Sequence, residues 1–238
     1  MRVVLLQIKL DSQSRSANVQ HINAVIDQAA GADPPPDLLV LPGACDTGGA
    51  APGSDWSDVS SVAMTANLST KAREWGVYMA AGAHLRRDQD VFGCSLLFDP
   101  DGDVAVRAVH EASLEDPATA SPIESWPSPV GPMAVLDPCA AQPLSQWVDQ
   151  DGADGLMALP TSGGWTGARN RSMNANIEAL RSGSQRDSGT YFAVVAEARA
   201  KSSAESAPAT FLCTPDGEVM ACVQGAEEAV LHVQVVLG

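Results

Sequence analysis

Residues 38–49 read LLVLPGACDTGG. Four apolar residues run into Pro42 and Gly43, as a buried strand does when it brings the chain to the carboxyl edge of a sheet. In folds that alternate strands and helices, ligands bind at that edge of the sheet. Gly43 has no side chain, so a position suited to a catalytic carboxylate holds no group that accepts a proton.

Strand and helix patterns alternate on both sides of this stretch. Residues 2–8, RVVLLQI, predict a strand, and residues 16–31 predict a helix. Its apolar face contains Val19, Ile22, Val25 and Ile26. A strand, a helix and a second strand in this order indicate a βαβ unit.

The chain continues with a second predicted helix near residues 58–74 and with consecutive strands within residues 76–85 and 91–109. Asp99-Pro100-Asp101-Gly102 predicts a hairpin inside the last of these segments.

The second half of the sequence repeats this order. Strands are predicted at 132–137, 155–160 and 190–197, helices near 141–150 and 170–187, a hairpin at 209–223 and a last strand at 229–237. The tip of the second hairpin, Thr214-Pro215-Asp216-Gly217, matches the first. We therefore expect an α/β fold of two similar βα halves in one domain, residues 1–238.

Composition excludes several classes of protein. The 238 residues carry 29 acidic against 14 basic side chains, a net charge of -15, which argues against nucleic acid and anionic membrane as partners. No apolar run of about 18 residues is present, as a membrane helix needs. Five cysteines without CxxC spacing indicate neither a metal site nor a disulfide framework. We expect a cytoplasmic protein without cofactors.

The local phrases and their order resemble the carbon-nitrogen hydrolase (nitrilase and aliphatic amidase) superfamily over nearly the whole chain. DLLVLPG (37–43) is similar to the family's strand ending in LPE, VRAVH (106–110) to its yRKvH, and VGPMAVLD (130–137) to its iGv.ICyD. FGCSLLFDPDG (92–102) and GADGLMALPTSGGW (152–165) match two further phrases. The resemblance implies a four-layer αββα sandwich and a homodimer.

The resemblance also implies three catalytic side chains. In the family a cysteine attacks the substrate carbon, a glutamate moves the proton and a lysine stabilises the developing charge. The glutamate position falls on Gly43, the lysine on Ala108 and the cysteine on Val135, so none of the three groups is present. Gly43 is also expected to need a positive φ.

Composition supports two of these losses whatever the alignment. The first glutamate of the sequence is Glu74, so no glutamate lies near the end of the LLVL strand in any alignment. Only three lysines exist, and none lies near the strand that ends at His110; they are Lys9, Lys71 and Lys201.

Displaced groups are the alternative. Cys139, four residues beyond Val135, is a candidate nucleophile, although a lone cysteine is more often a packed residue. Asp46 is a candidate base, although Asp before Thr-Gly-Gly is more often a turn former. The family's additional glutamate is not assigned; its candidates are Glu111, Glu115 and Glu124.

Three functions remain open. The expected one is a pseudoenzyme that binds a small molecule or a protein partner; the others are an unconventional amidase using Cys139 and a structural subunit. For the expected homodimer, the predicted helix near 170–187 carries Met173, Ile177 and Leu180 on one face.

Overall fold

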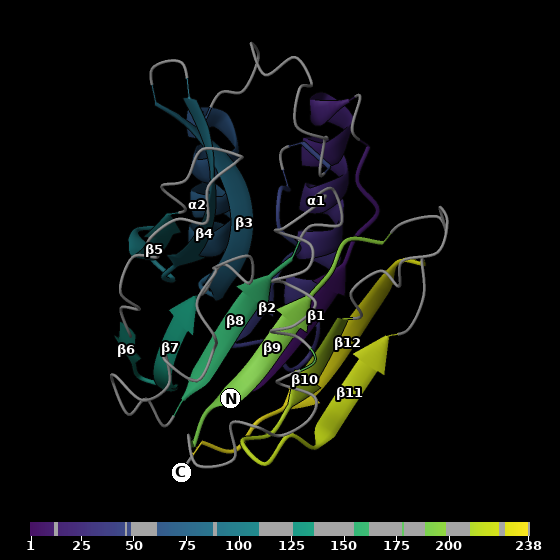
Figure 1. Ribbon diagram of the computed structural model, residues 1–238, viewed down its shortest axis with the longest axis vertical. Coiled ribbons are helices and arrows are strands. Elements are labelled where there is room, and N and C mark those ends of the chain that lie inside the picture. Colours follow the sequence, from purple (N-terminus) through teal and green to yellow (C-terminus); the bar gives the residue numbers. More distant parts are fainter. Residues whose placement is uncertain are drawn as a thin grey trace.

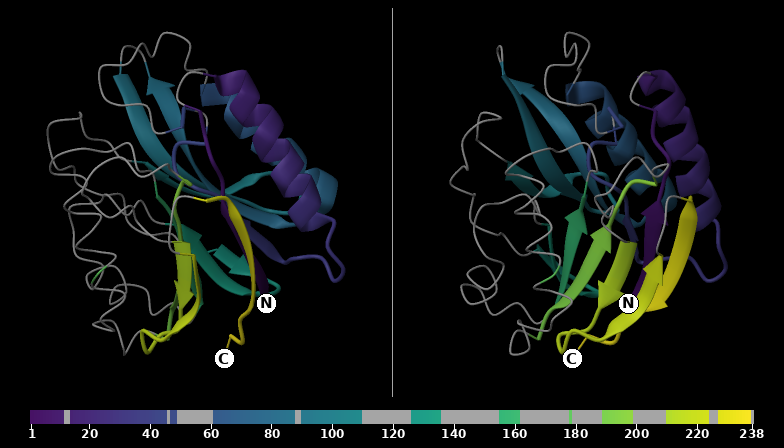
Figure 2. Two further views of the ribbon diagram at one scale, coloured as in Figure 1. Left: turned by 90° about the vertical axis from the view of Figure 1, so that its right-hand side faces the viewer. Right: turned by 45° about the vertical axis from the view of Figure 1, so that its right-hand side comes forward.

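Two six-stranded sheets face each other in the part of the chain that the computed structural model describes. The described residues are 1–11, 14–45, 47–48, 61–87, 90–109, 126–135, 155–161, 178, 189–198, 210–223 and 227–237. Figure 2 shows the two sheets side by side, with both described helices on the outer side of the first sheet.

The first sheet has the strand order β12-β1-β2-β3-β4-β5. Its strands are β1 (Arg2–Gln7), β2 (Leu38–Val40), β3 (Tyr78–Arg87), β4 (Asp90–Phe98), β5 (Val104–Val109) and β12 (Ala229–Gln234). Strands β1, β2 and β3 are parallel, and the other pairs are antiparallel.

The second sheet has the order β11-β10-β9-β8-β7-β6. Its strands are β6 (Trp126–Ser128), β7 (Gly131–Val135), β8 (Leu156–Pro160), β9 (Tyr191–Val195), β10 (Thr210–Cys213) and β11 (Val219–Val223). Strands β7, β8 and β9 are parallel, and β6, β10 and β11 add antiparallel neighbours.

The two sheets repeat one plan, which agrees with the two halves predicted from the sequence. Each has three parallel strands followed by an antiparallel hairpin, with one more antiparallel strand on the other side. The hairpin tips contain Gly102 and Gly217, with φ angles of 82° and 80°. Both predicted hairpins are confirmed.

Helices α1 (Arg15–Ala30) and α2 (Ser61–Trp75) cover the outer face of the first sheet. Ser14 caps α1, because its hydroxyl accepts a hydrogen bond from the N–H of Ala17. Ile22 and Ile26 are fully buried, which confirms the predicted face of α1. Helix α2 ends with Gly76 at a φ of 62°, a conformation that glycine adopts at little cost.

The apolar side chains form two cores. The helix-side core lies between the helices and the first sheet and includes Ile22, Leu68 and Phe98. The inter-sheet core lies between the two sheets and includes Val135 and Val195. Alternate residues of β1, β2, β3 and β4 supply the two cores, as a sheet covered on both faces requires.

Some sequence predictions differ from the structure or lie outside its described part. Strand β6 was not predicted, because three residues with a central Pro127 carry almost no strand signal. The fourth layer is predicted from the helices near 141–150 and 170–187, which lie outside the described residues except for the helical Glu178. In the part of the chain that is described, no helix is long and apolar enough to span a membrane.

Candidate functional site

Gly43 packs directly against β3. A Cβ added to Gly82 would lie 2.5 Å from the Cα of Gly43, so the two backbones approach as closely as glycines allow. The N–H of Gly82 donates to the carbonyl of Pro42, and the N–H of Cys45 donates to the carbonyl of Gly82. The expected positive φ at Gly43 is wrong: Ala44, at φ 51°, takes the left-handed conformation that turns the chain after β2.

Strand pairing connects Gly82, the neighbour of Gly43, with Ala108. Gly82 is paired with Ser95 on β4, and Ser95 is paired with Ala108 on β5. Ser95 is only 2% exposed. The structure therefore places two of the three expected catalytic positions along one transverse row of the first sheet.

Val135 belongs to the second sheet. It is the last residue of β7, fully buried in the inter-sheet core, and is paired with Ala158 of β8. Strand β7 contacts β4 and β5 across the sandwich. The position expected for the nucleophile therefore holds an aliphatic core side chain, on a strand that contacts β4 and β5.

The carboxyl ends of β1, β2, β8 and β9 meet in a four-strand seam. The N–H of Gly43 donates to the carbonyl of Thr161 at 2.8 Å, and the N–H and hydroxyl of Thr161 both donate to the carbonyl of Val195. On the other side, the N–H of Ala198 donates to the carbonyl of Ile8 at 2.9 Å. These bonds join the sheets at the edge where parallel α/β sheets hold ligands; the four strands lie at the centre of Figure 1.

Glu197 lies within this seam, between Val195 and Ala198. It is 5% exposed and is the only charged residue among the buried residues of the described chain. Sequence reasoning did not single it out. The available signal was an acidic residue directly after the apolar run of TYFAVVAE, which is the same kind of signal that drew attention to Gly43.

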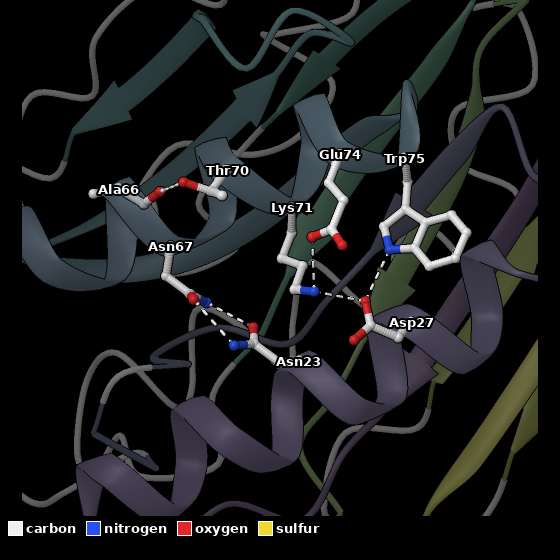
Figure 3. A network of polar contacts seen from close by, with 8 residues as sticks. All are labelled: Asn23, Asp27, Ala66, Asn67, Thr70, Lys71, Glu74 and Trp75. Carbon is white, nitrogen blue, oxygen red and sulfur yellow. Dashed lines mark hydrogen bonds and ion pairs between the residues drawn. The ribbon is translucent and has the colours of Figure 1, made fainter.

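Neither described lysine lies between the sheets. Lys71 bonds Asp27 at 2.7 Å and Glu74 at 2.9 Å across the α1–α2 surface (Figure 3). The hydrogen bonds that Lys71 donates to Asp27 and Glu74 raise its pKa. Burial opposes ionisation of Asp27, but hydrogen bonds from Lys71 and Trp75 outweigh it and lower its pKa. Lys9 is exposed two residues after the end of β1, and Lys201 lies outside the described residues.

The displaced candidates from the sequence are not placed. Asp46, Cys139, Glu111, Glu115 and Glu124 lie outside the described residues. Of the described cysteines, Cys45 and Cys94 are buried in the helix-side core, and the thiol of Cys45 contacts the carbonyl of Pro42 at 3.0 Å. No group of potential metal ligands occurs among the residues that the structure describes.

Comparison with known families identifies the fold. A model of the carbon-nitrogen hydrolase family matches residues 2–137, more than half of the chain. This chain belongs to the carbon-nitrogen hydrolase family. The resemblance seen in the sequence and the nitrilase-like sandwich it implied are therefore confirmed.

Solved structures support the same fold. The NitN amidase of Nesterenkonia sp. AN1 is 17% identical, with a TM-score of 0.78 over 99% of this chain and 93% of that chain. A variant of the same amidase with acrylamide added at its active-site cysteine has a TM-score of 0.78 at 16% identity, with the same coverage. A variant in complex with butyramide has a TM-score of 0.75 at 17% identity, over 99% of this chain and 90% of that chain. No curated protein sequence matches the chain.

Proposed function

We propose that this carbon-nitrogen hydrolase acts on small carboxamides and cleaves a non-peptide carbon–nitrogen bond with displaced catalytic groups. The observation that carries the proposal is the family match over residues 2–137, joined to a fold shared with amidases that take acrylamide and butyramide. The proposed ligand binds beside the four-strand seam and the Ser95–Ala108 row.

The proposed chemistry is acyl transfer to a cysteine. A thiolate attacks the amide carbon, the carbon–nitrogen bond breaks as the nitrogen takes a proton, and water then hydrolyses the thioester. Cys139 is the proposed nucleophile, because it follows the end of β7 by four residues. Removal of any such nucleophile abolishes this route, because no other group forms the thioester.

A non-catalytic binding protein is the second candidate. The observation that favours it is that Gly43, Ala108 and Val135 occupy the positions expected for the glutamate, the lysine and the cysteine. Without a nucleophile, a base and a cation at those positions, little of the usual acceleration has a source. Such a pseudoenzyme binds carboxamides, or supports a protein partner, without turnover.

Ammonia release from butyramide by the purified protein separates the two candidates. The hydrolase proposal expects turnover that Cys139→Ser abolishes and Cys222→Ser retains, since Cys222 is an exposed cysteine on β11. Butyramide binding without turnover supports the pseudoenzyme instead. A protein that neither binds nor hydrolyses small carboxamides contradicts the hydrolase and leaves only the support of a protein partner from the second candidate.

Assembly, cellular location and cofactor need complete the proposed function. We propose a homodimer, with the predicted helix near 170–187 at the interface. The acidic composition supports a cytoplasmic protein that does not bind nucleic acid. The proposed acyl transfer uses only protein side chains and water, so it needs no cofactor.

A further inference from the structure

We infer that the open edge of β11 binds an extended segment of another protein, with apolar residues along the strand and Lys or Arg at both ends of the segment. The inference goes beyond the proposed function, because β10 separates β11 from β9 and the four-strand seam. It holds whether or not the chain hydrolyses carboxamides.

Strand β11 is the last strand of the second sheet. It pairs with β10 on one side and with no described strand on the other, and it lies at the outer edge of the sheet in Figure 1. The backbone N–H and C=O groups along such an edge are the groups to which an added strand bonds.

Charged, proline or polar residues interrupt the other three edge strands but not β11. Strand β5 contains Arg107, and β6 contains Pro127. Strand β12 exposes His232 and Gln234 in alternation with less exposed residues. A charge or a proline hinders the pairing of an edge strand with another chain. The sequence of β11 is VMACV, which contains none of these residues.

Two consecutive apolar side chains of β11 are exposed at a β-bulge. The pairing with β10 shifts between Ala221 and Val219, so Met220 is the extra residue of β11. Val219 is 43% exposed and Met220 is 42% exposed. The bulge lies at the start of the strand, and Ala221–Val223 keep a regular ladder. A segment added to this edge therefore also covers apolar surface, which favours binding.

The charges around β11 define the ends of the bound segment. Residues 202–238 contain no Lys or Arg. Asp216 and Glu218 are exposed just before β11, and Glu227 is exposed shortly after it. Because complementary charges at the rim of an interface select the partner, the segment that fits carries basic residues at both ends.

The same charges disfavour a second copy of this chain as the occupant. Antiparallel pairing of two β11 strands brings the start of each strand beside the end of the other. Both ends carry acidic residues, so like charges come together and destabilise the pair.

Fluorescence anisotropy of labelled peptides with the full-length protein tests the inference. The first peptide is Lys-Lys-Val-Thr-Val-Thr-Val-Lys-Lys. A second peptide has proline in place of the central valine, which keeps the charge and hinders strand pairing, and a third has Glu in place of every Lys. The first peptide is expected to bind about tenfold more tightly than either of the others.

Two variants of the protein separate binding at the edge from general attraction between charges. Met220→Lys places a charge on β11 and is expected to weaken binding of the first peptide about tenfold. Val104→Lys is the matched control, because it adds the same charge at a valine of β5 that is 37% exposed, and it is expected to retain binding. If Met220→Lys does not fold, Cys222→Lys replaces it at another exposed position of β11.

Several outcomes overturn the inference. They are equal binding of the proline peptide or of the acidic-ended peptide, equal losses in the two lysine variants, and no binding of the first peptide. An oligomer of wild type that dissociates in Met220→Lys but not in Val104→Lys makes a second copy the occupant and also overturns it. Ammonia release from butyramide is measured in parallel and is expected to be the same in both variants and wild type, so failure of the inference leaves the proposed function intact.

Discussion

Gly82 sets the distance between β3 and the end of β2. Substitution by alanine puts a Cβ 2.5 Å from the Cα of Gly43, so the backbone must shift at the four-strand seam. We expect Gly82→Ala to destabilise the protein by about 1–3 kcal/mol, the usual cost of overpacking a core. Urea unfolding measures the change.

Gly76→Ala is the control for this substitution. Gly76 has a φ of 62° and no atom within 4 Å of an added Cβ, so alanine there carries only the backbone cost of about 1 kcal/mol. Gly82 has no positive φ, so its cost comes from packing. A Gly82→Ala variant as stable as Gly76→Ala contradicts the close approach.

Restoring the three family residues tests how far the site has changed around them. We expect Gly43→Glu, Ala108→Lys and Val135→Cys together to lower the melting temperature without raising amidase activity. Val135 belongs to the inter-sheet core, and the two new charges, one beside Gly82 and one beside buried Ser95, have no matching shell of hydrogen bonds. Val135→Cys alone is the control, since it adds no charge. Strong activity at unchanged stability contradicts the expectation.

Among the elements, the β4–β5 hairpin is anchored to a helix by its tip. Ser69 of α2 donates to the carbonyl of Gly102, and Arg73 donates to the carbonyl of Asp101. A Cβ on Gly102 would lie 2.5 Å from the carbonyl oxygen of Ser69. We expect Gly102→Ala to cost more than the roughly 1 kcal/mol that a positive φ alone imposes.

Gly217→Ala provides the comparison, because Gly217 has nearly the same φ in the equivalent turn of the β10–β11 hairpin. Both variants carry the backbone cost, so the excess for Gly102→Ala in chemical unfolding measures the contact with α2. Equal losses in the two hairpins would show that this contact contributes nothing.

Two sets of polar contacts join α1 to α2 (Figure 3). Asn23 and Asn67 exchange two amide hydrogen bonds, at 3.1 and 2.9 Å, and Asp27 bonds both Lys71 and Trp75. The lowered pKa of Asp27 means that its contribution is present above pH 3.8, its ordinary value, and is lost as pH falls through the folded pKa. The raised pKa of Lys71 gives a contribution that is lost as pH rises through its own folded pKa, above 10.5.

Asp27→Asn tests this dependence. The Asp27 side chain is 43% exposed, so screening by solvent limits the pair to less than about 1 kcal/mol. We expect the variant to be slightly less stable than wild type at pH 7 and to show a smaller loss below pH 3.8. Melting temperatures from pH 2 to pH 7 measure both effects, with Asp101→Asn, an exposed turn residue, as the control. Parallel curves for wild type and Asp27→Asn would contradict the linkage.

At the scale of the molecule, the sequence predicted the fold because its two halves carry strong local signals. Apolar runs define the parallel strands, and the DPDG and TPDG turns define both hairpins. The pairing of β12 with β1 and of β6 with β7 was harder to predict, because partner choice depends on contacts between residues far apart in the sequence. Pro127 further weakens the strand signal of β6 in the sequence.

The candidate site was less predictable than the fold. A resemblance assigns Gly43, Ala108 and Val135 one at a time, but only the register of β3, β4 and β5 places Gly43 and Ala108 along one row. Glu197 is buried within the four-strand seam, where the bonds between the two sheets, Gly43 to Thr161 and Ala198 to Ile8, join segments more than 100 residues apart. No local pattern contains that information.

Net charge governs the proposed association of two copies. Each chain carries a charge of -15, so two copies repel one another, and salt screens this repulsion. We expect light scattering at micromolar concentration to give a dimer mass, and the dimer to strengthen from 50 mM to 500 mM salt.

Ile177→Asp, on the predicted apolar face of residues 170–187, is expected to give a monomer. Met220→Asp is the control, because it adds the same charge at an exposed apolar position of β11. Dissociation by Met220→Asp but not by Ile177→Asp would place the interface at the free edge of the second sheet, since an exposed and uncharged edge strand is itself a surface on which two copies pair.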